Sequence, residues 1–179
     1  MNGRRIAVVL VALLAAALGI AATASARAVT LKPASFQAQG SLINGWYWLR
    51  AASHQATWAF DAGALQQAMP GRVYLNMTGL VTKGVSGGSG YSTSLKVIVS
   101  NGIRTQTTSM SLLNPFRPVD PEDSGGVGYY AYGNAYLSSS LWKGAQKLTV
   151  TVMPRYWQTY HVAANADSML IGYSISGTG

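Results

Sequence analysis

The sequence predicts an all-β domain, built either as a two-sheet antiparallel sandwich or as a barrel. Short runs rich in β-branched and aromatic residues recur along most of the chain, and many alternate apolar with polar side chains. Turn-forming residues separate these runs at intervals of roughly ten residues, as expected of short antiparallel strands. The chain has 179 residues and no cysteine. This length allows one domain with an apolar core, and the absence of cysteine excludes disulfides, thiolate metal sites and thiol nucleophiles.

The first 28 residues are predicted to form a secretory signal peptide. Arg4-Arg5 precedes an apolar run from Ile6 to Ala22, and small residues follow as Ala24-Ser25-Ala26 and Ala26-Arg27-Ala28. A basic start, an apolar stretch and an A-x-A-type end are the three parts of such a peptide. A membrane anchor is the alternative, because the apolar run is near the lower length limit of a membrane span. We expect bacterial-type Sec export, release of residues 29–179 as a single secreted domain, and no membrane insertion after cleavage.

Alternation of side chains places the predicted strands along this domain. In Val73–Thr82, for example, Leu75 and Met77 share one face, whereas Tyr74 and Asn76 share the other. One apolar and one polar face is typical of a sheet with one side in solvent. The predicted strands are Ser35–Gln39, Ala56–Asp61, Val73–Thr82, Ser94–Ser100, Arg104–Leu113, Gly128–Leu137, Lys147–Met153, Tyr160–Ala163 and Ser168–Ile175.

The connections between the predicted strands contain glycine, proline and asparagine. Asn101-Gly102 predicts a tight hairpin, because a type I′ turn needs positive φ at both central residues. Only Ala64–Met69 predicts a helix, which Pro70 ends.

Several segments occur in the order and pattern of one group of secreted folds. They are Phe36-Gln37-Ala38-Gln39, Thr57-Trp58-Ala59-Phe60-Asp61, Gly144, Leu148-Thr149-Val150-Thr151-Val152, His161-Val162 and Asp167-Ser168-Met169-Leu170-Ile171. In this pattern the chain resembles the galactose-binding-like jelly rolls that are common among carbohydrate-binding modules. The resemblance implies a two-sheet jelly roll and non-catalytic sugar binding.

Aromatic side chains are the candidate ligand-binding residues. Sugar rings present flat C–H faces that stack on indole and phenol rings, while nearby polar side chains bind the hydroxyls. The alternative for each ring is a place in the core, because Trp and Tyr are good strand formers and are buried on average. Trp58 and Phe60 share a strand face and are assigned to the core, whereas Tyr136 shares its parity with two of the candidates. The candidates are Trp46, Trp48, Tyr130, Tyr132, Trp142, Tyr156 and Trp157.

An acidic loop is the candidate metal site. Asp120, Glu122 and Asp123 lie between Pro118 and Gly126. Calcium takes roughly six to eight oxygen ligands, which closely spaced carboxylates and loop carbonyls can supply, and a plain solvated turn is the alternative. Jelly rolls of the group named above can also hold structural calcium at the aspartate that Asp167 matches. This chain has Gln37 and Gln39 where the second acid would lie, which favours a turn at Asn165-Ala166-Asp167 over a calcium site there. No cofactor other than a structural calcium ion is expected.

No catalytic residues are predicted. Gly84–Gly88 matches G-x-S-x-G, and Ser86, Asp123 and His161 occur in hydrolase order. A nucleophile elbow needs a strand before it and a helix after it, but the sequence around Ser86 predicts a glycine-rich loop with no amphipathic helix after it. The basic residues of 29–179 are scattered, so no nucleic-acid footprint is present either.

Two functions remain. The first is a secreted, non-enzymatic β-sandwich that binds a glycan or another component of the cell envelope through aromatics and polar loops. The alternative is a structural or adhesive surface protein that acts by self-association as a homo-oligomer, because exposed strand edges can pair with another copy.

Overall fold

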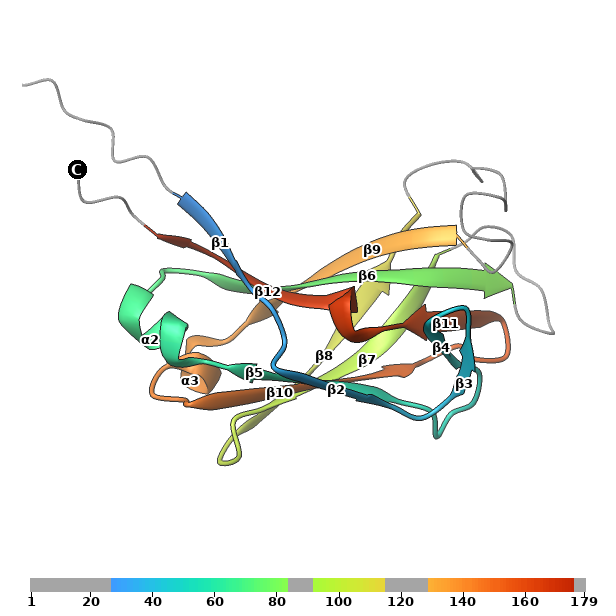
Figure 1. The fold of residues 1–179 in the computed structure, drawn as a ribbon, viewed down its shortest axis with the longest axis horizontal. Coiled ribbons are helices and arrows are strands. Elements are labelled where there is room, and N and C mark those ends of the chain that lie inside the picture. The colour runs from blue at the N-terminus through green and yellow to red at the C-terminus, as the bar shows by residue number, and fades with distance from the viewer. Residues whose placement is uncertain (1–26, 84–91, 115–128, 176–179) are drawn as a thin grey trace, which may run out of the picture. The chain divides into compact units, whose positions relative to one another are not determined.

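A computed structural model describes residues 27–83, 92–114 and 129–175, which form one compact unit. Two antiparallel sheets pack face to face in these ranges, and Figure 1 shows them as an upper and a lower layer. The predicted all-β sandwich is therefore confirmed. None of the helices in the described ranges is long and apolar enough to cross a membrane.

The first sheet has the strand order β1-β12-β6-β11-β4-β3, and β9 pairs with the other side of β6. The long strand β6 therefore lies at its centre, with β12 beside its first half and β11 beside its second half. The strands of this sheet are β1 (Arg27–Leu31), β3 (Ser41–Ile43), β4 (Trp46–Leu49), β6 (Val73–Lys83), β9 (Tyr129–Leu137), β11 (Tyr160–Ala164) and β12 (Met169–Ile175).

The second sheet has the order β2-β5-β10-β7-β8. The chain crosses repeatedly between the sheets, for example from β5 to β6 and from β9 to β10. Its strands are β2 (Ser35–Ala38), β5 (Ala56–Asp61), β7 (Thr93–Ser100), β8 (Thr105–Leu112) and β10 (Lys147–Pro154).

Three short helical segments connect the strands in the described ranges. They are α2 (Gly63–Ala68), α3 (Ser139–Trp142) and the 3₁₀ turn η2 (Ala166–Ser168). Helix α2 matches the predicted Ala64–Met69 and ends where Met69 adopts the left-handed conformation, with φ of 43°. Asn165 caps η2 through its side chain, and its carbonyl accepts a hydrogen bond from the indole of the core residue Trp58 at 3.0 Å.

Each predicted strand is present, with ends that differ by at most one residue, but β1, β3, β4 and α3 were not predicted. Strand β4 has no apolar–polar alternation because both of its faces are covered. Leu49 joins the main core, whereas Trp48 is buried on the opposite face. Strand β1 includes Arg27 and Ala28, which belong to the predicted signal peptide.

A seam between β8 and β9 joins the two sheets along one side. Leu113 and Tyr132 exchange two backbone hydrogen bonds of 2.9 Å. The Gln106 amide donates to the Tyr136 carbonyl at 2.9 Å and accepts from the Ser138 N–H at 3.0 Å. Between them, a Cβ on Gly133 would lie only 2.6 Å from the Ser111 carbonyl oxygen, so glycine permits the close approach of β8.

Candidate functional site

The outer face of the first sheet, which points away from the second sheet, carries a row of tyrosines. On β9 the residues Ala131, Ala135 and Leu137 point into the core, and the alternation of a strand then turns the residues between them outward. Tyr130, Tyr132 and Tyr136 are accordingly 43%, 47% and 50% exposed. From Tyr130 to Tyr136 the row extends about 20 Å along the strand.

Strand β6 supplies the second column of this surface. Its register pairs Tyr74 with Tyr136, Asn76 with Asn134 and Thr78 with Tyr132. The rings of Tyr74 and Tyr136 make an edge-to-face contact with centroids 6.0 Å apart. Two amide side chains therefore lie between aromatic rings, which gives hydrogen-bonding groups and apolar faces on one surface.

Gly172 of β12 leaves room for one of these amides. It pairs with Tyr74, and a Cβ built on it would lie 2.5 Å from the Asn76 Nδ2 atom. The Asn76 side chain therefore lies over the backbone of β12 at Gly172, because no side chain stands there.

A small apolar cluster forms the other end of the surface. Trp48, Leu80 and Ala163 are buried there, and Ile43 and Trp46 pack against them. Trp46 meets Tyr130 edge to face, with ring centroids 6.2 Å apart. These rings come from β4 and β9, which are separated by β11 and β6 and thus by about 14 Å of sheet. The two rings must therefore extend across the sheet and meet above it.

Arg50 and His161 adjoin this cluster. The register that pairs Val162 with Leu49 places Arg50 opposite His161 when it is continued by one residue. The Arg50 guanidinium carbon lies 5.2 Å from the centroid of the Trp48 ring, which is a cation–π contact. Burial and, second, the positive charge of Arg50 lower the pKa of His161 below its ordinary value of 6.5, so this imidazole is neutral at pH 7.

We call this surface the aromatic face and define it as the outward side chains Trp46, Tyr74, Asn76, Tyr130, Tyr132, Asn134 and Tyr136. It combines exposed rings with amide donors and acceptors, the two components that bind a flat polar ligand. Only two acidic residues lie in the described ranges, Asp61 at the end of β5 and Asp167 in η2. Neither belongs to an outward position of the first sheet, so within those ranges the face has no carboxylate for acid–base chemistry.

Three of the predicted binding residues belong to this surface: Trp46, Tyr130 and Tyr132. Trp48 lies beneath it and has no exposed surface, so its ring cannot stack on a ligand. Its indole N–H is also without a hydrogen-bond partner among the described residues.

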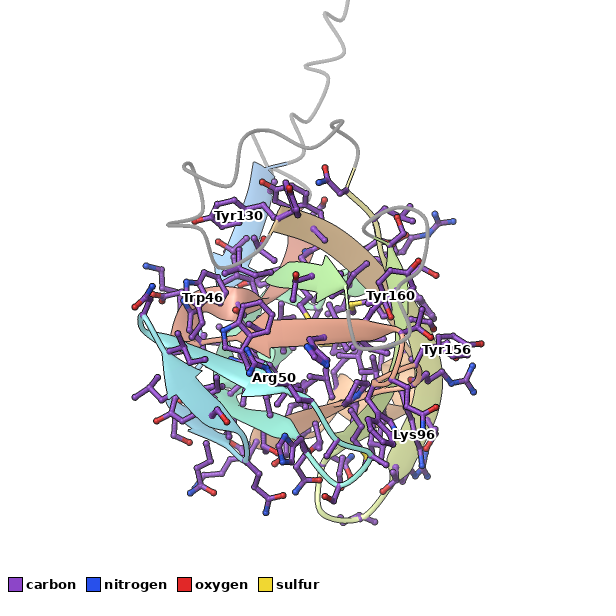
Figure 2. All side chains as sticks on the ribbon, turned by 90° about the vertical axis from the view of Figure 1, so that its right-hand side faces the viewer. Trp46, Arg50, Lys96, Tyr130, Tyr156 and Tyr160 are labelled. Atoms are coloured by element: carbon purple, nitrogen blue, oxygen red, sulfur yellow. The ribbon has the colours of Figure 1, made fainter. Side chains whose placement is uncertain are left out.

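The other predicted residues lie elsewhere. Trp142 is in α3 and is buried in the main core, with the Lys143 ammonium 5.7 Å from its ring centroid. Tyr156 and Trp157 lie in the turn between β10 and β11, and Tyr156 is exposed. Figure 2 shows Tyr156 on the opposite side of the view from Trp46 and Tyr130.

The candidate calcium residues Asp120, Glu122 and Asp123 lie outside the described residues, as do Gly84–Gly88 of the G-x-S-x-G match. Within the described ranges no group of three or more His, Cys, Asp or Glu residues could hold a metal ion.

Sequence reasoning missed Tyr74, Asn76 and Asn134 as members of the site. The parity of Val73–Thr82 already placed Tyr74 and Asn76 on one face, but the pairing of β6 with β9 could not be deduced. This pairing is the contact that brings the two asparagines opposite each other.

No protein-family model matches this chain, and no curated protein matches it. Among solved structures, it is similar to the carbohydrate-binding module TmCBM61, whose structure is described as a complex with β-1,4-galactotriose. The sequences are 8% identical, the match covers 81% of this chain and 87% of that chain, and the TM-score is 0.30. This is a weak likeness of fold, and function is inferred below from this chain's own residues.

Proposed function

We propose that the protein is a secreted, non-catalytic module that binds an extracellular carbohydrate on the aromatic face. The observation that supports this most is the arrangement of Tyr136 and Tyr74, then Asn134 and Asn76, then Tyr132, and finally Tyr130 and Trp46 along one sheet surface. Rings at both ends can stack on sugar C–H faces, and the amides between them can bind hydroxyls. A surface of this length suits several consecutive sugars of a polymer better than one monosaccharide.

Exposure of these rings is what favours a ligand over a purely structural role. Large aromatic side chains are buried on average, and a group of exposed ones indicates an interaction site. Strand formation does not require tyrosine at these positions, because threonine is an equally good strand former and exposes no apolar ring.

The alternative, a structural protein that assembles edge to edge, is less well supported. The edge strands β1, β2 and β3 have only 5, 4 and 3 residues. The longer edge strand β8 faces β9 across the seam, where Gln106 and Leu113 make their bonds. Short or covered edges are the usual protection against pairing with another copy. We therefore expect a monomer in light scattering, and oligomers that grow with concentration would favour assembly.

Binding is tested by screening the secreted protein against immobilised glycans and then titrating the best ligand with Tyr132→Ala and Tyr156→Ala. Both tyrosines are exposed, but only Tyr132 belongs to the aromatic face. We expect Tyr132→Ala to weaken binding about tenfold, because it removes one stacking ring worth about 1.4 kcal/mol. Tyr156→Ala should change the affinity less than about twofold, because this ring lies outside the proposed site.

Equal losses in the two variants would place the site elsewhere, and no binding to any glycan would reject the proposal.

Export is tested on the same preparation. Cleavage after Ala26 leaves strand β1 whole, so the secreted protein should begin at Arg27, and a start inside the strand would contradict this assignment.

A further inference from the structure

Arg50 lies beside the aromatic face, at the end formed by the apolar cluster, which we call the cationic end. Its positive charge bears on the charge of the ligand. Arg50 follows β4, and its guanidinium lies over the Trp48 ring next to the apolar cluster that supports Trp46. In Figure 2, Tyr130, Trp46 and Arg50 follow one another downward from the upper left, with Arg50 nearest the middle of the view. Trp46 packs against the cluster that contains Trp48, so a polymer that stacks on Trp46 and extends past Trp48 reaches this cation.

The Trp48 ring holds the Arg50 side chain, and no acidic residue of the described ranges neutralises it. Stacking on an indole uses the flat face of a guanidinium and leaves the N–H groups at its rim available, in the fork that fits a carboxylate. The two acids in the described ranges, Asp61 and Asp167, lie in β5 and in η2. Asp61 accepts a hydrogen bond from the Gly63 N–H at 2.9 Å, and η2 is anchored to Trp58 of the core.

The surroundings of Arg50 add no negative charge in the described part of the chain. The neighbouring His161 lies close enough for the two side chains to interact electrostatically. The His54 Nδ1 atom accepts the Arg50 backbone N–H at 3.1 Å. Residues 27–179 have 11 Lys and Arg against 5 Asp and Glu, so the field of the secreted protein also attracts anions.

We propose that the carbohydrate bound on the aromatic face is acidic and that Arg50 binds its anionic group, a carboxylate or a sulfate on a sugar ring. This inference rests on the proposed function and names the ligand class of the same site. The rings and amides give contact with the sugar chain, and the guanidinium discriminates acidic from neutral polymers. Charge-assisted hydrogen bonds of this kind are shorter and stronger than neutral ones.

The test compares polygalacturonate with the same polymer after methyl esterification, which replaces each carboxylate by a neutral ester and leaves the sugar backbone unchanged. A sulfated galactan, as a third probe, distinguishes sulfate from carboxylate as the preferred anion. The secreted protein is titrated with each polymer in the wild-type form and as Arg50→Gln, Arg50→Lys and Arg104→Gln. Arg104 is exposed at the turn between β7 and β8, away from the aromatic face. Arg104→Gln is the matched control, because it removes one positive charge, as Arg50→Gln does.

We expect an acidic polymer to bind at least tenfold more tightly than the neutral ester and to lose affinity as salt is added. Arg50→Gln should remove about tenfold or more of this preference, as expected for a charge-assisted hydrogen bond. Arg50→Lys should restore part of it, because lysine keeps the charge but loses the fork. Arg104→Gln should stay within about twofold of the wild type.

Two results overturn the inference while the proposed function survives. One is equal binding of charged and esterified polymers that depends on Tyr132. The other is an equal loss in Arg50→Gln and Arg104→Gln, which would assign the preference to net charge alone. Failure of every glycan to bind would instead reject the proposed function.

Discussion

The two outer faces of the sandwich are built on the same alternation but differ in chemistry. On the second sheet one row across the strands reads Thr107, Ile98, Thr151, Thr57 and Gln37. The hydroxyls of Thr57 and Thr151 lie 3.0 Å apart. The aromatic residues of its described strands, Phe36, Trp58 and Phe60, are packed in the core instead.

The first sheet exposes tyrosines at the equivalent outward positions of β9 and β6. Both sheets form with their own choice of outward residue, so the tyrosines are not needed to make a strand. The difference supports the proposed ligand role of the aromatic face, whereas the outer face of the second sheet, which we call the threonine-rich face, carries mainly small polar side chains in this row.

The first sheet has a small apolar cluster on its outer face, and its removal should unfold the protein more readily than any change on the threonine-rich face. Trp48→Ala should lower the free energy of unfolding by about 3–5 kcal/mol, because a fully buried indole is replaced by a cavity. Thr151→Ala on the second sheet should lower it by about 0.5 kcal/mol or less. Urea denaturation of both variants gives the two values.

Trp48→Phe separates packing from ligand contact. Phenylalanine keeps most of the apolar volume and removes an indole N–H that is buried without a partner among the described residues. This variant should therefore stay folded and bind glycan like the wild type. A large loss of binding in a stable Trp48→Phe protein would return Trp48 to the site.

The seam that joins the two sheets gives the second prediction. Gly133→Ala places a Cβ 2.6 Å from the Ser111 carbonyl oxygen and 2.9 Å from a Met110 side-chain atom. Relief of this overlap requires β8 and β9 to separate, which should lower the free energy of unfolding by about 1–3 kcal/mol. A Cβ on Gly71 meets nothing within 4 Å, so Gly71→Ala is the matched control and should be neutral or slightly stabilising. Equal urea midpoints for the two variants would show that the seam is not closely packed.

The sequence was sufficient for the fold class and for nine of the twelve strands in the described ranges, but not for the site. Strands such as Ala56–Asp61 and Val73–Lys83 alternate cleanly, because one face is buried and the other is solvated. Strand β4 was not predicted, because Trp48 and Leu49 are buried on opposite faces and the strand therefore has no alternation of apolar and polar residues.

The candidate site needed information that no local pattern contains. Trp48 and Trp142 resemble binding residues in composition, but both are buried, one under the aromatic face and one in the main core. Asn76 and Asn134 become a pair only through the register of β6 with β9, two strands that are far apart in sequence. Likewise, nothing local to Arg50 indicates that it would lie beside His161 of β11.

The smallest expected effect concerns His161, which borders the aromatic face and has no counterpart on the threonine-rich face. Burial first and the charge of Arg50 second lower the pKa of His161 in the folded protein below 6.5. The unfolded chain then binds more protons than the folded one as the pH falls through 6.5 toward the folded pKa, so the free energy of unfolding decreases over this window.

NMR titration of the His161 imidazole should give a midpoint below 6.5. In Arg50→Gln the midpoint should rise only part of the way, because the burial remains. His161→Gln should abolish this part of the pH dependence of unfolding. A midpoint at or above 6.5, or one that Arg50→Gln leaves unchanged, would show that the two side chains do not interact, and would weaken the assignment of Arg50 to the cationic end of the face.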